Sequence, residues 1–167
     1  DYDAALLDQQ ARQLAARGDY PSEDRARFDA ALSIAVLRHI SDLHIGMQLR
    51  APLLRRLLAR VNALEPDLIV ITGDIFDFDP SYIEEGCREL AELDAPLGVF
   101  AVLGNHDTYT GADAVALGLA TWTRIRLLRN DWARIELEGG AFALAGVEDP
   151  GHGWNERDGT HEALDRL

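Results

Sequence analysis

The chain has 167 residues, 47% of them apolar, and a formal net charge of −13 at pH 7. This length and composition predict one globular domain with its own core and exclude a mainly disordered chain. The acidic balance argues against a surface built for the nucleic-acid backbone, so nucleic acid is not expected as a partner. A small phosphoester is not excluded, because bound divalent ions would make a site far less negative than its surroundings.

Cysteine and hydropathy add two limits. The single cysteine, Cys87, excludes an intrachain disulfide and is expected to be a packed small residue on a helix. No apolar stretch approaches the roughly 20 residues that span a bilayer.

The amino-terminal part differs in character from the rest. Residues 1–30 are expected to hold an amphipathic helix over 3–17, ended by Gly18, and a polar linker. Packing on the domain explains such a helix most simply, and a juxtamembrane helix is the alternative. Residues 31–167 are expected to form the main domain.

The main domain alternates apolar runs with helical patterns. Near-continuous apolar runs predict strands buried on both faces, and leucines at helical spacing predict the helices between them. The expected strands are 33–40, 67–71 and 97–103, and the helices between them are 51–64 and 80–93. This order predicts an α/β fold with two right-handed βαβ units. A helix over 111–122 and a hairpin over 135–144, turning at Gly139-Gly140, are expected after them.

Each expected strand is followed directly by a polar cluster. The clusters are Ser41-Asp42-Leu43-His44, Gly73-Asp74-Ile75-Phe76-Asp77 and Gly104-Asn105-His106-Asp107. Because the carboxyl ends of parallel strands meet at one edge of a sheet, these clusters are expected to lie together in the loops there. Taken singly, their polar residues would more simply be turn residues or helix caps. Three clusters in order favour a site for divalent ions such as Mn, Fe, Zn or Mg, in which one carboxylate can bridge two ions.

The spacing Asp42-x-His44, Gly73-Asp74-x-x-Asp77 and Gly104-Asn105-His106-Asp107 resembles the first three motifs of the calcineurin-like metallophosphoesterases. The resemblance covers roughly residues 32–150 and includes features of a bacterial phosphodiesterase-like branch. It implies the family's βαβαβ sheet sandwich. It also implies hydrolysis of a phosphodiester or phosphomonoester, small or lipid-linked, by a hydroxide held between two metal ions that attacks phosphorus.

The resemblance implies a metal-binding role for four residues. Asp42 and His44 would bind one divalent ion, Asp74 would bridge both ions, and Asn105 would bind the second ion.

It also implies roles for the remaining residues of the motifs. His106 would act as a general acid or as a donor to the developing charge, and Asp77 would orient and stabilise it. Asp107 would support the ligands from behind.

The sequence departs from the family pattern after His106. The family takes further histidine ligands from a His-x-Pro segment and a Gly-His-x-His segment, whereas His152 and His161 lie in neither context. The chain also starts at Asp1 rather than at methionine. We therefore expect the amino-terminal part of the domain, incomplete at its carboxyl end. It would have one weak metal site, a second ion that is weak or absent, and little turnover from this chain alone.

Two alternatives to catalysis stay open: a non-catalytic binding module on the same fold, or an inactive fragment. Substrate identity depends on loops outside the motifs, and aromatic residues such as Phe76, Tyr82 and Tyr109 could line a pocket or simply pack in the core. Members of the bacterial branch often carry an amino-terminal anchor or export signal, so sequence upstream could bring the protein to a membrane. The location is not determined, and a cytoplasmic or membrane-associated bacterial protein is the expectation.

Overall fold

The computed structural model describes residues 37–137, 140–147 and 149. Within this part of the chain, four strands form one parallel sheet in the order β1-β2-β3-β4. The strands are β1 (Leu37–Ile40), β2 (Leu68–Thr72), β3 (Val99–Val102) and β4 (Arg126–Leu127). The helices that connect them in turn are α3 (Ala51–Asn62), α4 (Ile83–Leu90) and α5 (Asn105–Trp122). The predicted α/β fold is confirmed.

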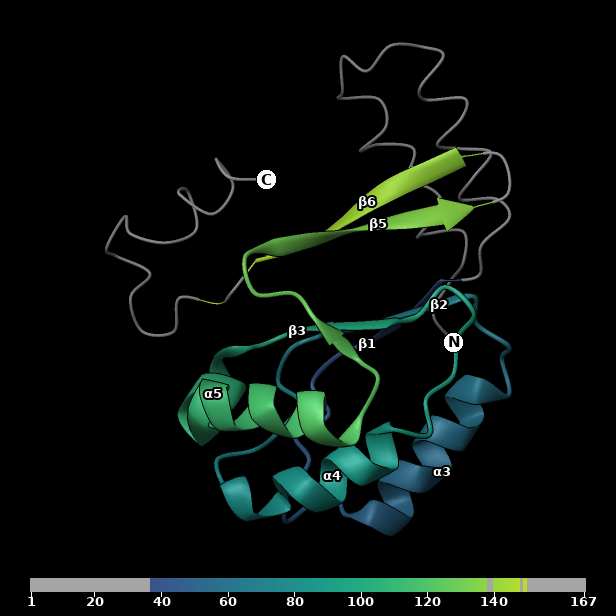
Figure 1. Cartoon of the computed structure of the whole chain (residues 1–167). Helices are drawn as coiled ribbons and strands as arrows, with labels where there is room; N and C mark the ends of the chain where they lie inside the picture. Colours follow the sequence, from purple (N-terminus) through teal and green to yellow (C-terminus); the bar gives the residue numbers. More distant parts are fainter. Residues whose placement is uncertain (1–36, 138–139, 148, 150–167) are drawn as a thin grey trace, which may run out of the picture.

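The helices all lie on one face of the sheet (Figure 1). When strand order follows chain order, right-handed crossovers must place every connecting helix on the same side. One apolar cluster joins this helical layer to the sheet, with Leu54 and Leu58 of α3, Leu90 of α4 and Leu119 of α5 all nearly inaccessible. Burial of their side chains is the main stabilising contribution of this layer.

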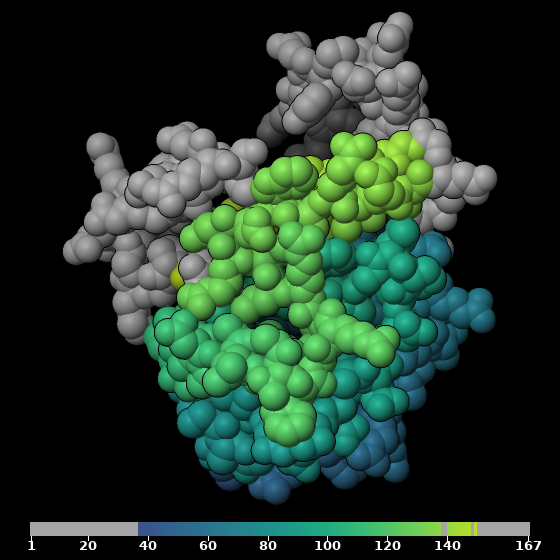
Figure 2. Space-filling model, viewed as in Figure 1, coloured from purple at the N-terminus to yellow at the C-terminus, as the bar shows by residue number. Residues whose placement is uncertain are grey.

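An antiparallel hairpin covers the opposite face of the sheet. Its strands are β5 (Asp131–Leu137) and β6 (Gly140–Gly146). Ala133 and Ile135 of the hairpin are buried in a second apolar cluster with Leu68 and Phe100 of the sheet. The hairpin lies above the sheet in Figure 1, and the space-filling view shows it resting on the body of the molecule (Figure 2). The order of layers is therefore helices, parallel sheet, hairpin.

Several boundaries differ from the sequence predictions. The hairpin is confirmed but longer, and Gly140 pairs with Leu137 inside it rather than forming the turn. The predicted helix over 80–93 is a short 3-10 turn at Pro80–Tyr82 followed by α4. Strand β4 was not predicted, because two residues give no periodic pattern.

The prediction of strands buried on both faces is right for β2 and β3 but wrong for β1. Leu37 and His39 are exposed on β1, which is an edge strand among the described residues. His39 instead makes a hydrogen bond with the Thr72 hydroxyl at 2.6 Å. The extension over 1–30, the residues 33–36 of the first predicted strand, His152 and His161 all lie outside the described residues.

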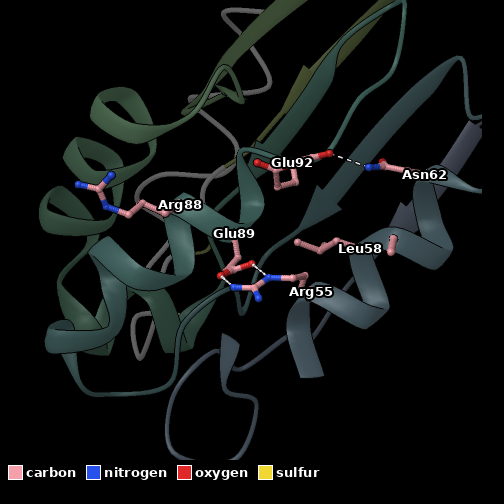
Figure 3. A pocket seen from close by; sticks show the side chains of 7 residues that line it. Arg55, Leu58, Asn62, Arg88, Glu89 and Glu92 are labelled. Carbon is pink, nitrogen blue, oxygen red and sulfur yellow. Dashed lines mark hydrogen bonds and ion pairs between the residues drawn. The ribbon is translucent and has the colours of Figure 1, made fainter. Parts of the chain in front are cut away.

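A shallow hollow separates α3 from α4 on the helical side (Figure 3). Two contacts join its walls: Arg55 forms a two-point ion pair with Glu89, and the Asn62 side chain donates to the backbone carbonyl of Glu92 at 2.6 Å. These contacts hold α3 against α4. None of the lining residues belongs to the three polar clusters.

Cys87 is fully buried on α4, as predicted. Burial raises the pKa of its thiol to about 12, so almost no thiolate exists at neutral pH, and the thiolate is the reactive form. We expect Cys87 to resist alkylation by iodoacetamide at pH 8 in the native protein and to react fully in denaturant, as mass spectrometry would show. Rapid alkylation of the native protein would contradict this burial.

Candidate metal centre

The loops after β1 and β2 run side by side because their backbone pairing continues beyond the strands. The His44 N–H donates to the Asp74 carbonyl at 2.9 Å, and the Ile45 N–H donates to the Ile75 carbonyl at 2.8 Å. The Asp77 N–H returns to the Ile45 carbonyl at 3.1 Å. These bonds hold the first polar cluster against the second.

The loop after β3 joins them through two glycines. A Cβ atom at Gly73 would lie 2.6 Å from the Gly104 nitrogen, and a Cβ at Gly104 would lie 2.6 Å from the Asp74 nitrogen and closer still to its carboxylate. Gly73 also has a φ of 89°, which disfavours any side chain. Only glycine at both positions allows the second and third loops to approach this closely.

Asp42, His44 and Asp74 consequently form one cluster. One ligand atom from each lies within 4.8 Å of the others. Asp42 is exposed, while His44 and Asp74 are half-buried. Asp74 Oδ1 also accepts the His106 N–H at 3.0 Å, so the amino-terminal turn of α5 stabilises its negative charge. Two carboxylates and an imidazole match the three protein ligands that a catalytic metal site requires at minimum.

The backbone of this cluster is unusual. Asp42, His44 and Asp74 have φ values of 54°, 45° and 51°. This left-handed region costs roughly 1–2 kcal/mol for a residue with a Cβ, and such residues gather at functional sites. Here the loop hydrogen bonds offset that cost and turn all three side chains toward one point. The donor set and its backbone therefore fit a divalent ion.

His106 lies beside this cluster. Its Nδ1 is 3.2 Å from Asp77 Oδ1, and its ring packs edge-on against His44 with centroids 4.5 Å apart. His44, Asp77 and His106 also form a second group of potential ligand atoms within 4.8 Å. Geometry alone thus allows His106 two roles: a partner of Asp77 or a metal ligand.

Asn105 and His106 were expected in a turn, and that prediction is wrong. Helix α5 begins at Asn105, six residues before the predicted start at Gly111, so both side chains project from its first turn. Gly111 instead marks a kink inside the helix, with a φ of 115°. Asn105 is half-buried at the start of the helix, next to the loop that touches Asp74.

Asp107 fastens the loops from behind. It is fully buried, and its oxygens accept the backbone N–H groups of Ile75 at 3.0 Å, Phe76 at 2.9 Å and Gly104 at 3.0 Å. Burial raises the pKa of this carboxyl, while the hydrogen bonds from these three N–H groups lower it and oppose the shift. One side chain therefore ties the loop after β2 to the loop after β3.

The aromatic residues divide in a way that the sequence did not show. Phe76 is fully buried in the core, whereas Tyr109 is partly exposed and lies 5.9 Å from His106 between ring centroids. Phe78 was not singled out, yet its ring lies 4.8 Å from that of His106 and stacks on Tyr109 at 5.8 Å. Its place directly after Asp77 was the available signal.

Comparison with known proteins agrees with this geometry. A family model described as calcineurin-like phosphoesterase matches residues 36–160. The chain belongs to this family. The match spans the parallel sheet, helices α3, α4 and α5 and the hairpin, so the resemblance seen in the motifs is confirmed.

Curated relatives carry related names. An uncharacterised metallophosphoesterase of Campylobacter jejuni is 32% identical over 110 residues, 66% of this chain and 28% of that protein. A Danio rerio transmembrane protein with a metallophosphoesterase domain is 32% identical over 125 residues, 68% of this chain and 29% of that protein. The UDP-2,3-diacylglucosamine pyrophosphatase LpxG of Chlamydia muridarum is 39% identical over 77 residues, 44% of this chain and 23% of that enzyme. The chain thus spans less than a third of each.

The name of the Danio rerio relative raises the question of a membrane. Among the helices that the structure describes, none is both long enough and apolar enough to cross a bilayer.

Proposed function

We propose that this protein hydrolyses phosphoesters with two divalent metal ions. Asp42 and His44 would hold one ion, Asp74 would bridge both, and Asn105 would hold the second. The observation that supports this most is the convergence of three side chains from left-handed backbone positions, in a chain that belongs to the metallophosphoesterases. When bound, such ions lower the pKa of coordinated water toward about 7 and neutralise the phosphoryl oxygens.

His106, oriented by Asp77, would donate a proton to the leaving oxygen. In the proposed arrangement Asp77 accepts a hydrogen bond from His106 Nδ1, which leaves Nε2 of the same ring for the substrate. A proton on Nε2 can be given to the leaving oxygen as it departs from phosphorus. Asp77 is a positioning residue because it acts through His106.

The proposed substrate is a small or lipid-linked phosphoester. One relative that matches part of this chain is named a UDP-2,3-diacylglucosamine pyrophosphatase, which supports a lipid-linked substrate. Proximity to a membrane would suit such a substrate and remains part of the proposal. This mixed oxygen and nitrogen ligand set suits Mn, Fe, Zn or Mg.

A non-catalytic binding module is the second candidate. It is favoured by one observation: within the described residues, our assignment gives the second ion only Asp74 and Asn105. We therefore propose that this ion binds weakly to the chain and that the chain by itself turns over slowly.

Metal titration tests the ligand assignment. We expect calorimetry with Mn²⁺ to show one ion bound per chain and Asp74→Asn to weaken it by at least about 100-fold, more than the 10–100-fold typical of residues that merely support ligands. Asp94→Asn is the matched control, because Asp94 is exposed and precedes the amino end of β3, whereas the clusters follow the carboxyl ends of the strands. Equal Mn²⁺ affinity in wild type and Asp74→Asn would refute the assignment.

A further inference from the structure

Phe78 has a backbone conformation that its own packing does not explain. Its φ is 52°, in the left-handed region that bulky residues rarely occupy. Its side chain is nevertheless 59% exposed, so burial in the core does not compensate for the strain. Strain of this kind, roughly 1–3 kcal/mol, concentrates at ligand sites.

The exposed ring of Phe78 lies against the rings of His106 and Tyr109. Phe78 is tilted at 59° against His106 and lies nearly parallel to Tyr109, at an interplanar angle of 3°. Tyr109 is 37% exposed and meets His106 at 62°. We call these two residues, Phe78 and Tyr109, the aromatic pair. They present partly exposed apolar surface beside one imidazole, Phe78 from the loop after β2 and Tyr109 from the first part of helix α5.

His106 connects the aromatic pair to the ligand cluster. Its ring touches His44 of the cluster at 4.5 Å and Phe78 of the pair at 4.8 Å, between centroids. A phosphoester with its phosphoryl group at the cluster and its leaving oxygen at His106 would therefore extend its leaving group over the pair.

The charges beside the pair restrict the chemistry of that group. Asp77 and Asp79 flank Phe78 in the chain, and the Asp77 carboxylate lies 3.2 Å from His106 Nδ1. Like charges repel, so an anionic leaving group is disfavoured there. Aromatic side chains with exposed faces bind apolar groups, which lose contact with water on binding.

We propose that Phe78 and Tyr109 form a subsite for a neutral, apolar leaving group, such as an aryl or acyl-chain moiety. This proposal rests on the proposed function, because it takes the position of the phosphoryl group from the ligand cluster and the position of the leaving oxygen from His106.

Phosphonate binding tests the subsite without requiring turnover. Methyl-, phenyl- and hexylphosphonate would be titrated by calorimetry into the chain in saturating Mn²⁺. We expect the phenyl and hexyl compounds to bind about tenfold more tightly than methylphosphonate, from the apolar area that they bury. The ratio of the affinities for phenylphosphonate and hexylphosphonate distinguishes a preference for an aryl group from a preference for an acyl chain.

Two variants assign the effect to the pair. Asparagine tolerates a positive φ, so Phe78→Asn should fold with an unchanged or higher Tm while it reduces the tenfold preference to about twofold. Tyr109→Gln should reduce the preference in the same direction. Affinity for methylphosphonate should stay within about twofold in both variants. Leu117→Ser is the control: Leu117 is 69% exposed and lies twelve residues along α5 from Asn105, beyond the kink at Gly111.

Each outcome has a distinct meaning. Equal binding of all three phosphonates, or a preference unchanged in both variants, would overturn the subsite and leave the proposed function intact. Binding by none of the three would overturn the proposed function and the subsite together.

Discussion

Replacing His106 by alanine should lower the hydrolysis rate by 10²–10⁴-fold, the usual contribution of a positioned proton donor, without loss of bound metal. The effect should depend on the leaving group. A p-nitrophenyl ester departs as a stable anion and needs little protonation, whereas an alkyl ester departs as a strongly basic oxygen and needs it most. The measurement is kcat for both esters in wild type and variant, with Mn²⁺ affinity measured alongside by calorimetry.

Three results distinguish the roles that the geometry allows His106. A loss confined to the alkyl ester identifies a general acid. An equal loss for both esters identifies a donor to the phosphoryl oxygens instead. A fall in Mn²⁺ affinity would show that His106 joins His44 and Asp77 as a ligand, and our assignment would be wrong. Asp77→Asn is the matched comparison: it keeps an oxygen for Nδ1 but removes the charge, so we expect a smaller loss of rate and unchanged metal affinity.

The sequence could predict that these polar residues lie together because each of them belongs to a short local motif. Asp42, Asp74 and Asn105 each follow an apolar run, and the topology of parallel strands brings such positions to one edge. The same logic explains why the α/β fold was predictable. The convergence of Asp42, His44 and Asp74 is confirmed as geometry, and their service as metal ligands stays a prediction.

What the sequence missed depends on contacts between distant segments. Helix α5 starts at Asn105, where Asp107 in the first turn accepts the Gly104 N–H. Apolar periodicity does not predict a helical turn made of polar residues. Strand β4 exists only through its pairing with β3. The exposure of Phe78 beside His106 follows from a backbone angle, which no pattern of residue types encodes.

Asp107 shows that the same bonds stabilise the fold and shape the centre. It joins the loop that carries Asp74 to the turn that carries His106, at a position with no access to solvent. A change here should therefore affect stability and metal binding together. A change at a proposed ligand such as Asp42, which is exposed, should affect metal binding alone.

Asp107→Ala should lower the free energy of unfolding by about 3–5 kcal/mol, because it leaves three backbone N–H groups buried without an acceptor. Asp107→Asn keeps one oxygen for Ile75 and Phe76 but turns an amide toward the Gly104 N–H, so about 1–2 kcal/mol is expected. Asp113→Ala is the control on the same helix: its side chain is 95% exposed, and a surface ion pair contributes about 0–1 kcal/mol. Urea unfolding measures all three.

A loss below about 1 kcal/mol in Asp107→Ala would show that water or a local shift replaces the carboxylate. If the loops that support the proposed ligands are loosened, the Mn²⁺ affinity of folded Asp107→Ala should fall by about 10–100-fold. If the loss of stability is below about 1 kcal/mol, the fall in Mn²⁺ affinity should be smaller than this.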